Sequence, residues 1–192
     1  MLFDTIYKSL IFNDLFISVS PWLQQRRMRK VRKLQEKAIE AARNKDVLTV
    51  VFFLQSSSIW KYDSLYQKLK ASNRFKPYIV VSPYNVHLNY DMEECFNVMR
   101  KTFAYAKEKG YNPISAYDFD HKRWIDIRKT LNPDIVFFPK PYKDTLPKYH
   151  LYHFQDKLTL HAPYGICCID IFRINYNLPF NNLLWKFLVE TS

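Results

Sequence analysis

Residues 47–69, VLTVVFFLQSSSIWKYDSLYQKL, decide the fold that this chain is expected to adopt. The stretch begins with a run of β-branched, aromatic and aliphatic residues, which is typical of a strand buried on both faces. The polar residues 55–58 follow, and a helical pattern then places Tyr62, Leu65, Tyr66 and Leu69 on one face. A strand, a short polar loop and a helix open an α/β domain, in which ligands bind at the carboxyl ends of the strands.

The polar loop holds the first candidate binding residues, Ser56, Ser57 and Ser58. Serine hydroxyls and free backbone amides at the start of a helix suit phosphate or another anion. The alternative is that these serines only cap the helix. The sequence leaves both interpretations open.

The remainder of the chain repeats the alternation of strand and helix patterns. Asp91 begins a capping-box sequence, and Gly110 ends the helix that follows it. Further helices are expected at residues 121–131, capped by Asp118 or Asp120, and at residues 146–154. Further strands are expected at residues 78–82, 112–117, 134–138 and 157–162. The pattern predicts an α/β fold with a mostly parallel sheet and helices on both faces.

Parallel strands bring the loops at their carboxyl ends to one edge of the sheet. We therefore expect Ser57, Tyr142 and Tyr164 to share one surface cleft. Because this edge is rich in hydroxyl groups, we expect it to bind a sugar or a phosphorylated polyol. The remaining candidate substrate-binding residues at this edge are Tyr84, Pro163 and Gly165.

Composition excludes several kinds of site. With two glycines, the chain carries neither a dinucleotide fingerprint nor a P-loop, and we expect no cofactor. Cys95, Cys167 and Cys168 lack metal-ligand spacing and are interpreted as reduced thiols. The five histidines form no metal motif, so no metal site is expected.

The N-terminal 45 residues form a separate amphipathic and basic arm in this interpretation, and residues 46–192 form the α/β lobe. Residues 24–45 hold nine basic side chains against two acidic ones, which is +7 of the net charge of +11. Residues 1–23 are too polar to span a membrane and lack the features of a signal peptide. An apolar stretch followed by a basic helix fits an interfacial anchor on an anionic membrane. The expected membrane-binding residues are Trp22, Arg26, Arg27, Arg29, Lys30, Arg32 and Lys33.

This anchor predicts a peripheral location on the cytoplasmic face of the cell membrane. The alternative is that the arm packs on the α/β lobe or on a partner while its charges stay in solvent. Nucleic acid is not expected, because no aromatic residues are interleaved with the basic ones.

The C-terminal residues 166–192 are apolar but lose the clear alternation, although the last dozen could begin a helix. Three interpretations stay open for this segment. It belongs to a larger architecture, it folds back on the lobe, or it forms a homo-oligomer contact.

Four motifs, taken in order, carry a resemblance to a known family. They are SSIWKYDSLY at residues 57–66, RFKP at 74–77, PDIVFF at 133–138 with Pro141 and Tyr142, and APYG at 162–165. In this order they resemble the CDP-glycerol glycerophosphotransferase, or teichoic acid polymerase-like, family of bacterial cell-surface polysaccharide biosynthesis. The resemblance covers roughly residues 46–191.

The resemblance implies a GT-B fold of two Rossmann-like lobes, of which these residues would form the N-terminal, acceptor-side lobe. The lobe that holds CDP-glycerol or a related donor would then lie outside them, and the chain alone would be inactive. The family often has a His-Gly step where this chain has Pro163-Tyr164-Gly165. The nearest histidine, His161, is therefore the candidate catalytic base, and a structural histidine is the alternative. A non-catalytic α/β module that docks on a membrane or a partner chain is the rival interpretation of the whole chain.

Overall fold

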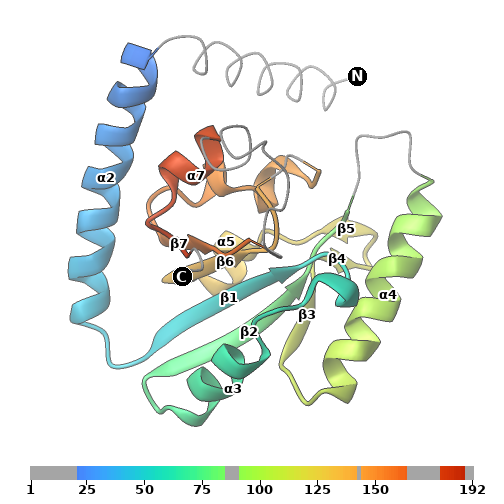
Figure 1. The fold of residues 1–192 in the computed structure, drawn as a ribbon. Helices are drawn as coiled ribbons and strands as arrows, with labels where there is room; N and C mark the ends of the chain where they lie inside the picture. The colour runs from blue at the N-terminus through green and yellow to red at the C-terminus, as the bar shows by residue number, and fades with distance from the viewer. Residues whose placement is uncertain (1–20, 85–90, 142–143, 164–177, 189–192) are drawn as a thin grey trace.

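The computed structural model of the chain describes residues 21–84, 91–141, 144–163 and 178–188. Six strands form one sheet in the order β3-β2-β1-β6-β7-β8, and every neighbouring pair is parallel. In chain order this is third, second, first, fourth, fifth, sixth, which is the Rossmann-like order. The expected α/β fold is therefore confirmed (Figure 1). The sheet strands are β1 (Leu48–Leu54), β2 (Phe75–Val81), β3 (Pro113–Ser115), β6 (Ile135–Phe138), β7 (Leu158–His161) and β8 (Lys186–Phe187).

β1 is buried on both faces, as its sequence predicts. On one face, Phe52 contacts Trp60, Tyr62 and Tyr66 from the connection to α3 (Asp63–Ala71) and from α3 itself. On the other face, the next residue, Phe53, packs near two 3₁₀ turns, η2 (Pro147–Tyr149) and η3 (Leu151–His153). Because both faces are covered, the strand has no polar side and reads as a continuous apolar run.

Helix α4 (Met92–Glu108) begins and ends where the sequence predicts. The Asp91 carboxylate accepts a 2.9 Å hydrogen bond from the backbone N–H of Glu93. Gly110 follows the helix with φ of +70°, a conformation that glycine adopts without steric penalty. Cys95, Met99 and Ala106 face the core.

The helix expected at residues 121–131 is confirmed only for its last five residues. This segment holds the second strand of an antiparallel hairpin, β4 (Tyr117–Asp118) with β5 (Arg123–Trp124), followed by the five-residue helix α5 (Ile127–Leu131). Trp124 packs on Tyr117 with ring centroids 4.8 Å apart, and Lys122 has a positive φ that breaks a helix. Asp126, rather than Asp118 or Asp120, caps α5.

The short helix expected at residues 146–154 is wrong. The turns η2 and η3 occupy this segment and are separated by His150, which has extended backbone angles. Tyr149, Leu151 and Phe154 are all buried, so packing of these large side chains overrides helical continuity.

The described part of the C-terminal segment folds back on the lobe, which was one of the three open interpretations. It forms the short helix α7 (Pro179–Leu183) and then β8, which pairs with β7. Phe180 and Leu183 are 3% exposed. This segment therefore completes the core and adds the sixth strand of the sheet.

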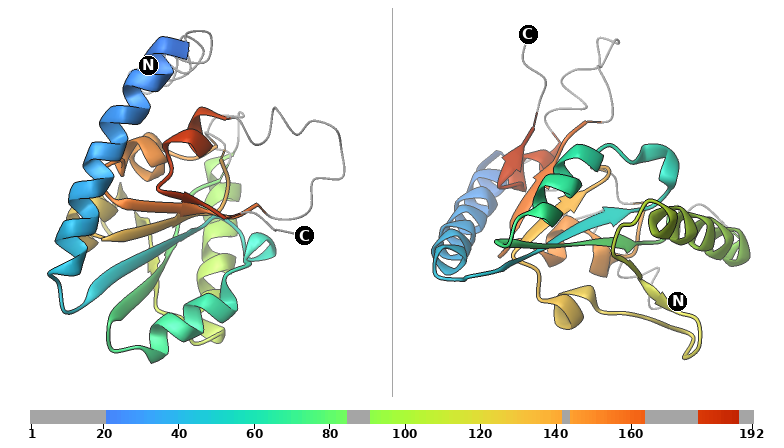
Figure 2. Two further views of the ribbon diagram at one scale, coloured as in Figure 1. Left: turned by 60° about the vertical axis from the view of Figure 1, so that its left-hand side comes forward. Right: turned by 90° about the horizontal axis from the view of Figure 1, so that it is seen from below.

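Helix α2 (Pro21–Arg43) lies against the lobe, at the opposite end of the sheet from α4 (Figures 1 and 2). Val31 is 1% exposed, and the Gln35 side-chain amide donates to the Leu183 carbonyl at 2.9 Å. The Arg27 guanidinium lies 4.1 Å from the centre of the Tyr152 ring. The apolar stripe of α2 is thus used in packing, and its solvent side carries the basic residues.

Candidate functional site

The Rossmann-like order places a topological switch point between β1 and β6, where the connections leave the sheet in opposite directions. In open α/β sheets, ligands bind outside the carboxyl ends of the strands at such a point. The polar and charged residues gathered there come from the ends of β1, β2, β6 and β7. We refer to them as the switch-point cluster: Gln55, Ser56, Ser58, Lys61, Tyr62, Tyr84, Lys140, Asp144 and His161.

The serines of the cluster cap a local turn. Ser56 Oγ accepts a 3.4 Å hydrogen bond from the backbone N–H of Ser58, and the two hydroxyl oxygens are 3.0 Å apart. Ser57 begins the three-residue 3₁₀ turn η1 (Ser57–Ile59). Ser56 therefore caps η1 and not α3, whose N-cap is Tyr62 and has no side-chain capping hydrogen bond. So short a turn provides no helix terminus for an anion, and any anion here needs a side-chain cation.

Lys61 supplies that cation. Its ammonium group is partly buried, donates to the Pro139 carbonyl at 3.1 Å and lies 5.4 Å from the centre of the Tyr62 ring. Burial lowers the pKa of Lys61 to about 8. Among the residues that the structure describes, no carboxylate forms an ion pair with this ammonium group. Lys61 is thus a partly desolvated cation without a paired anion at the switch point.

Tyr62 and His161 connect the ends of β6 and β7. The Tyr62 hydroxyl accepts from the Ala162 N–H at 3.0 Å and donates to the Phe138 carbonyl at 3.5 Å. His161 Nδ1 lies 3.0 Å from the same carbonyl oxygen, which assigns the ring proton to Nδ1. Burial, with a smaller contribution from the charge of Lys61, lowers the pKa of His161 to about 4. At neutral pH the ring is therefore uncharged, with Nε2 as its acceptor atom.

The cluster contains a second lysine, Lys140. The Lys140 ammonium lies 3.4 Å from an Asp144 carboxylate oxygen and 4.0 Å from the centre of the Tyr84 ring. The Gln55 amide nitrogen donates to the other Asp144 oxygen at 3.0 Å and contacts the Pro83 carbonyl at 3.5 Å. Lys140 thus has a carboxylate partner, whereas Lys61 has none among the described residues.

The structure brings many of the residues expected from the sequence to one edge. Ser56, Ser57, Ser58 and Tyr84 follow β1 and β2, and His161 ends β7. Pro163, two residues after β7, is partly buried at the same edge. Tyr142, Tyr164 and Gly165 lie outside the described residues, so the predicted shared cleft stays a prediction.

Sequence reasoning missed Gln55, Lys61, Lys140 and Asp144. One signal for Lys61 was available, because it is a lone cation among aromatic residues immediately after a buried strand. Lys140 lies between two prolines at the end of another strand. The pairing of Gln55 with Asp144 spans 89 residues, and no local pattern reveals it.

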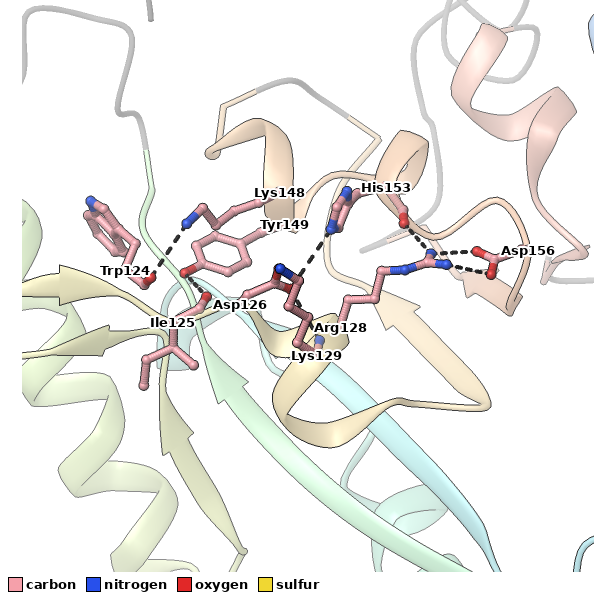
Figure 3. Close-up of polar contacts among 9 residues, drawn as sticks. All are labelled: Trp124, Ile125, Asp126, Arg128, Lys129, Lys148, Tyr149, His153 and Asp156. Atoms are coloured by element: carbon pink, nitrogen blue, oxygen red, sulfur yellow. Dashed lines mark hydrogen bonds and ion pairs between the residues drawn. The ribbon is translucent and has the colours of Figure 1, made fainter.

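A separate polar network surrounds α5 (Figure 3). Arg128 binds both Asp156 carboxylate oxygens, at 2.5 and 2.6 Å, and donates to the His153 carbonyl at 2.7 Å. The His153 ring lies 3.9 Å from Asp126, and the Tyr149 hydroxyl contacts the Ile125 carbonyl at 2.7 Å. Its acidic groups have basic neighbours, and its bonds join α5 to the turns η2 and η3. We therefore interpret this network as structural.

Two further findings bear on the kind of site. No trio of histidine, cysteine or acidic side chains suited to a metal ion occurs within the described residues. None of the described helices combines the length and the apolar character that crossing a membrane requires.

Comparison with protein-family models, curated proteins and solved structures finds no match to this chain. Evidence for a function therefore comes from the geometry of the switch-point cluster and from the sequence motifs described above.

Proposed function

We propose that the chain binds a phosphorylated polyol or sugar at the switch point. In this proposal it serves as the acceptor-side lobe of a glycerophosphotransferase or glycosyltransferase-like enzyme of bacterial cell-surface polysaccharide biosynthesis. The observation that carries the proposal is Lys61, a partly buried ammonium without a carboxylate partner among the described residues.

Desolvation of Lys61 favours the binding of an anion. A buried cation is unfavourable until an anion pairs with it. A phosphate beside Lys61 would provide that pair, with charge-assisted hydrogen bonds to the ammonium group. The polar and charged side chains of the switch-point cluster suit a polar ligand rather than an apolar one. Because the chain has two glycines and no P-loop, a nucleoside triphosphate fits this site less well.

The proposed reaction follows from the family resemblance. An acceptor hydroxyl attacks the β-phosphorus of a CDP-linked donor, the bond to the bridging oxygen breaks, and CMP leaves. This lobe would position the acceptor, which is a large part of catalysis in phosphoryl-type transfer. The neutral His161 imidazole remains the candidate base for the attacking hydroxyl, although its low pKa makes it a weak one.

Calorimetric titration with glycerol 3-phosphate tests the binding proposal. We expect the unmodified chain to bind and Lys61→Met to lose at least about tenfold in affinity, because a charge-assisted hydrogen bond contributes about 1.5–3 kcal/mol.

Lys68→Met is the matched control, since Lys68 is an exposed lysine on α3 and its replacement changes the net charge equally. Equal affinities of the Lys61 and Lys68 variants would show that the phosphate does not bind at Lys61.

A second candidate function, docking on an anionic membrane surface, is favoured by the solvent side of α2. Trp22 is 64% exposed, and exposed cations recur behind it every three or four residues, so they share one helix face. The apolar stripe of α2 is occupied by packing, so such contact would be electrostatic, with Trp22 as its apolar element. The exposed cations that share this face are Arg26, Arg29, Lys30, Lys33 and Lys37, whereas the exposed Arg32 and Arg43 lie on another side of α2.

Co-sedimentation with phosphatidylserine-containing vesicles tests this candidate. We expect binding at low salt and release at high salt, because added ions screen exposed charges. Replacing Arg26, Arg29, Lys30 and Lys33 with glutamine should lower binding at least about tenfold, since each cation near the surface contributes about 1 kcal/mol.

The control carries glutamine at four exposed lysines elsewhere, Lys68, Lys76, Lys101 and Lys107. If both variants bind vesicles equally, net charge rather than the α2 face determines the binding, and the docking proposal is wrong.

A further inference from the structure

Gln55 has a buried polar atom that lacks a hydrogen-bond partner among the described residues. The residue directly follows β1 at the switch point and is 2% exposed. Its amide nitrogen donates to Asp144, but its side-chain oxygen, Oε1, is buried and makes no hydrogen bond to any residue that the structure describes. Buried polar atoms in native proteins nearly always have a partner, so an acceptor without one among the described residues, at a strand end, is a candidate to bind a donor from a ligand.

The orientation of this amide is fixed by its neighbours. Turning it over would place Oε1 against Asp144 Oδ1 and the Pro83 carbonyl, both of which are acceptors. Asp144 is held in turn by Lys140. Gln55 Oε1 is therefore kept as an acceptor, with no donor from the part of the chain that the structure describes.

Gln55 and Lys61 lie in the same loop and contact the same neighbouring loop. Both lie between β1 and α3, and both contact the segment that follows β6, Gln55 through Asp144 and Lys61 through Pro139. Within the described residues, the switch point thus combines a cation without an anionic partner, Lys61, and an acceptor without a donor, Gln55 Oε1. A phosphate satisfies the first group, and a hydroxyl satisfies the second.

We propose that Gln55, oriented by Asp144, recognises a free hydroxyl group of a bound ligand by accepting a hydrogen bond from it. The phosphate of the same ligand pairs with Lys61. This inference rests on the proposed function and specifies it: the site selects phosphomonoesters that carry a hydroxyl group over those that do not. The hydroxyl donates its proton to Gln55 Oε1. A ligand without the hydroxyl leaves this acceptor unsatisfied and binds more weakly.

Two probes of nearly equal size separate the two parts of the site. Glycerol 3-phosphate carries two hydroxyl groups, and propyl phosphate carries none. By calorimetry we expect the unmodified chain to bind glycerol 3-phosphate about tenfold more tightly than propyl phosphate, as expected for one hydrogen bond in a buried site. Gln55→Met should remove this preference while leaving propyl phosphate binding within about twofold of the original.

Two further variants complete the test. Lys61→Met should weaken the binding of both ligands and leave the ratio of their affinities unchanged. Asp144→Asn preserves the shape of the side chain but allows the Gln55 amide to turn over, and it should reduce the preference several-fold even if Gln55→Met fails to fold.

The possible failures are distinguishable. If the unmodified chain binds both probes equally, or if Gln55→Met and Asp144→Asn both keep the full preference, hydroxyl recognition by Gln55 is wrong and the phosphate site stands. If the unmodified chain binds neither probe, the proposed function is wrong, and this inference with it.

Discussion

Lys61→Met is expected to make the protein more stable although it removes the proposed binding function. The folded-state pKa of Lys61, about 8, lies below the ordinary value of 10.5, because burial disfavours the charged form. Below pH 8 the folded protein therefore carries a charged group that is better solvated in the unfolded chain. Removing that group should raise the free energy of unfolding by roughly 1–3 kcal/mol, which corresponds to about 2–4 °C in Tm for each kcal/mol in a chain of this size.

The pH dependence of stability gives an independent readout of the same residue. Between pH 8 and 10.5 the unfolded chain binds more protons at Lys61 than the folded one, so this residue's contribution to stability rises with pH. The free energies of unfolding of the original protein and of the Lys61→Met variant, measured by chemical denaturation, should therefore converge as pH rises through this window. Lys68→Met, an exposed control on α3, should show no such convergence. A Lys61→Met variant less stable than the original would mean that the hydrogen bond to Pro139 outweighs desolvation and that Lys61 is structural.

His161 is expected to cause a large loss of stability in acid. Its folded-state pKa of about 4 lies below the ordinary value of 6.5, since the ring is buried and 3% exposed. As pH falls from 6.5 to 4, the unfolded chain takes up a proton that the folded chain excludes, so stability is lost across this window. The full difference corresponds to roughly 3 kcal/mol. The pKa of His153 is also lowered by burial, and it adds a contribution of the same sign.

His161→Asn tests this assignment, because asparagine retains a donor for the Phe138 carbonyl but does not titrate. The variant will lose packing against Phe180 and Phe187, so the comparison is the change in stability between pH 7 and pH 4.5 rather than its level. This change should be smaller in His161→Asn by about 2 kcal/mol or more. An unchanged acid response in His161→Asn would refute the buried, neutral state of His161.

The local sequence pattern correctly predicted those helices and strands in which the intrinsic preference of the segment is the same as the structure favoured by its packing. The apolar run of β1 and the capped α4 are each specified by residues close in the chain, such as Asp91 and Gly110. Alternation of strands and helices then constrained the sheet to be mostly parallel.

Long-range packing decided the elements that the sequence did not predict. Trp124 lies in a hairpin because Tyr117 and Phe96 provide an aromatic surface for it, and Phe96 belongs to another element, α4. Strand β8 exists because β7 offers it an edge, although its two residues have no strand pattern of their own. The sequence predicted the edge of the sheet at which the switch-point cluster lies. It did not identify Lys61, Gln55 or Asp144, whose significance comes from burial and from partners far away in the chain.

A crystal structure of the chain with bound glycerol 3-phosphate tests the central claim most directly. The account predicts that the phosphate lies at the carboxyl ends of β1 and β6, within hydrogen-bond distance of Lys61 Nζ. A phosphate bound instead to the exposed cations of α2, with Lys61 still bonded only to Pro139, would contradict it.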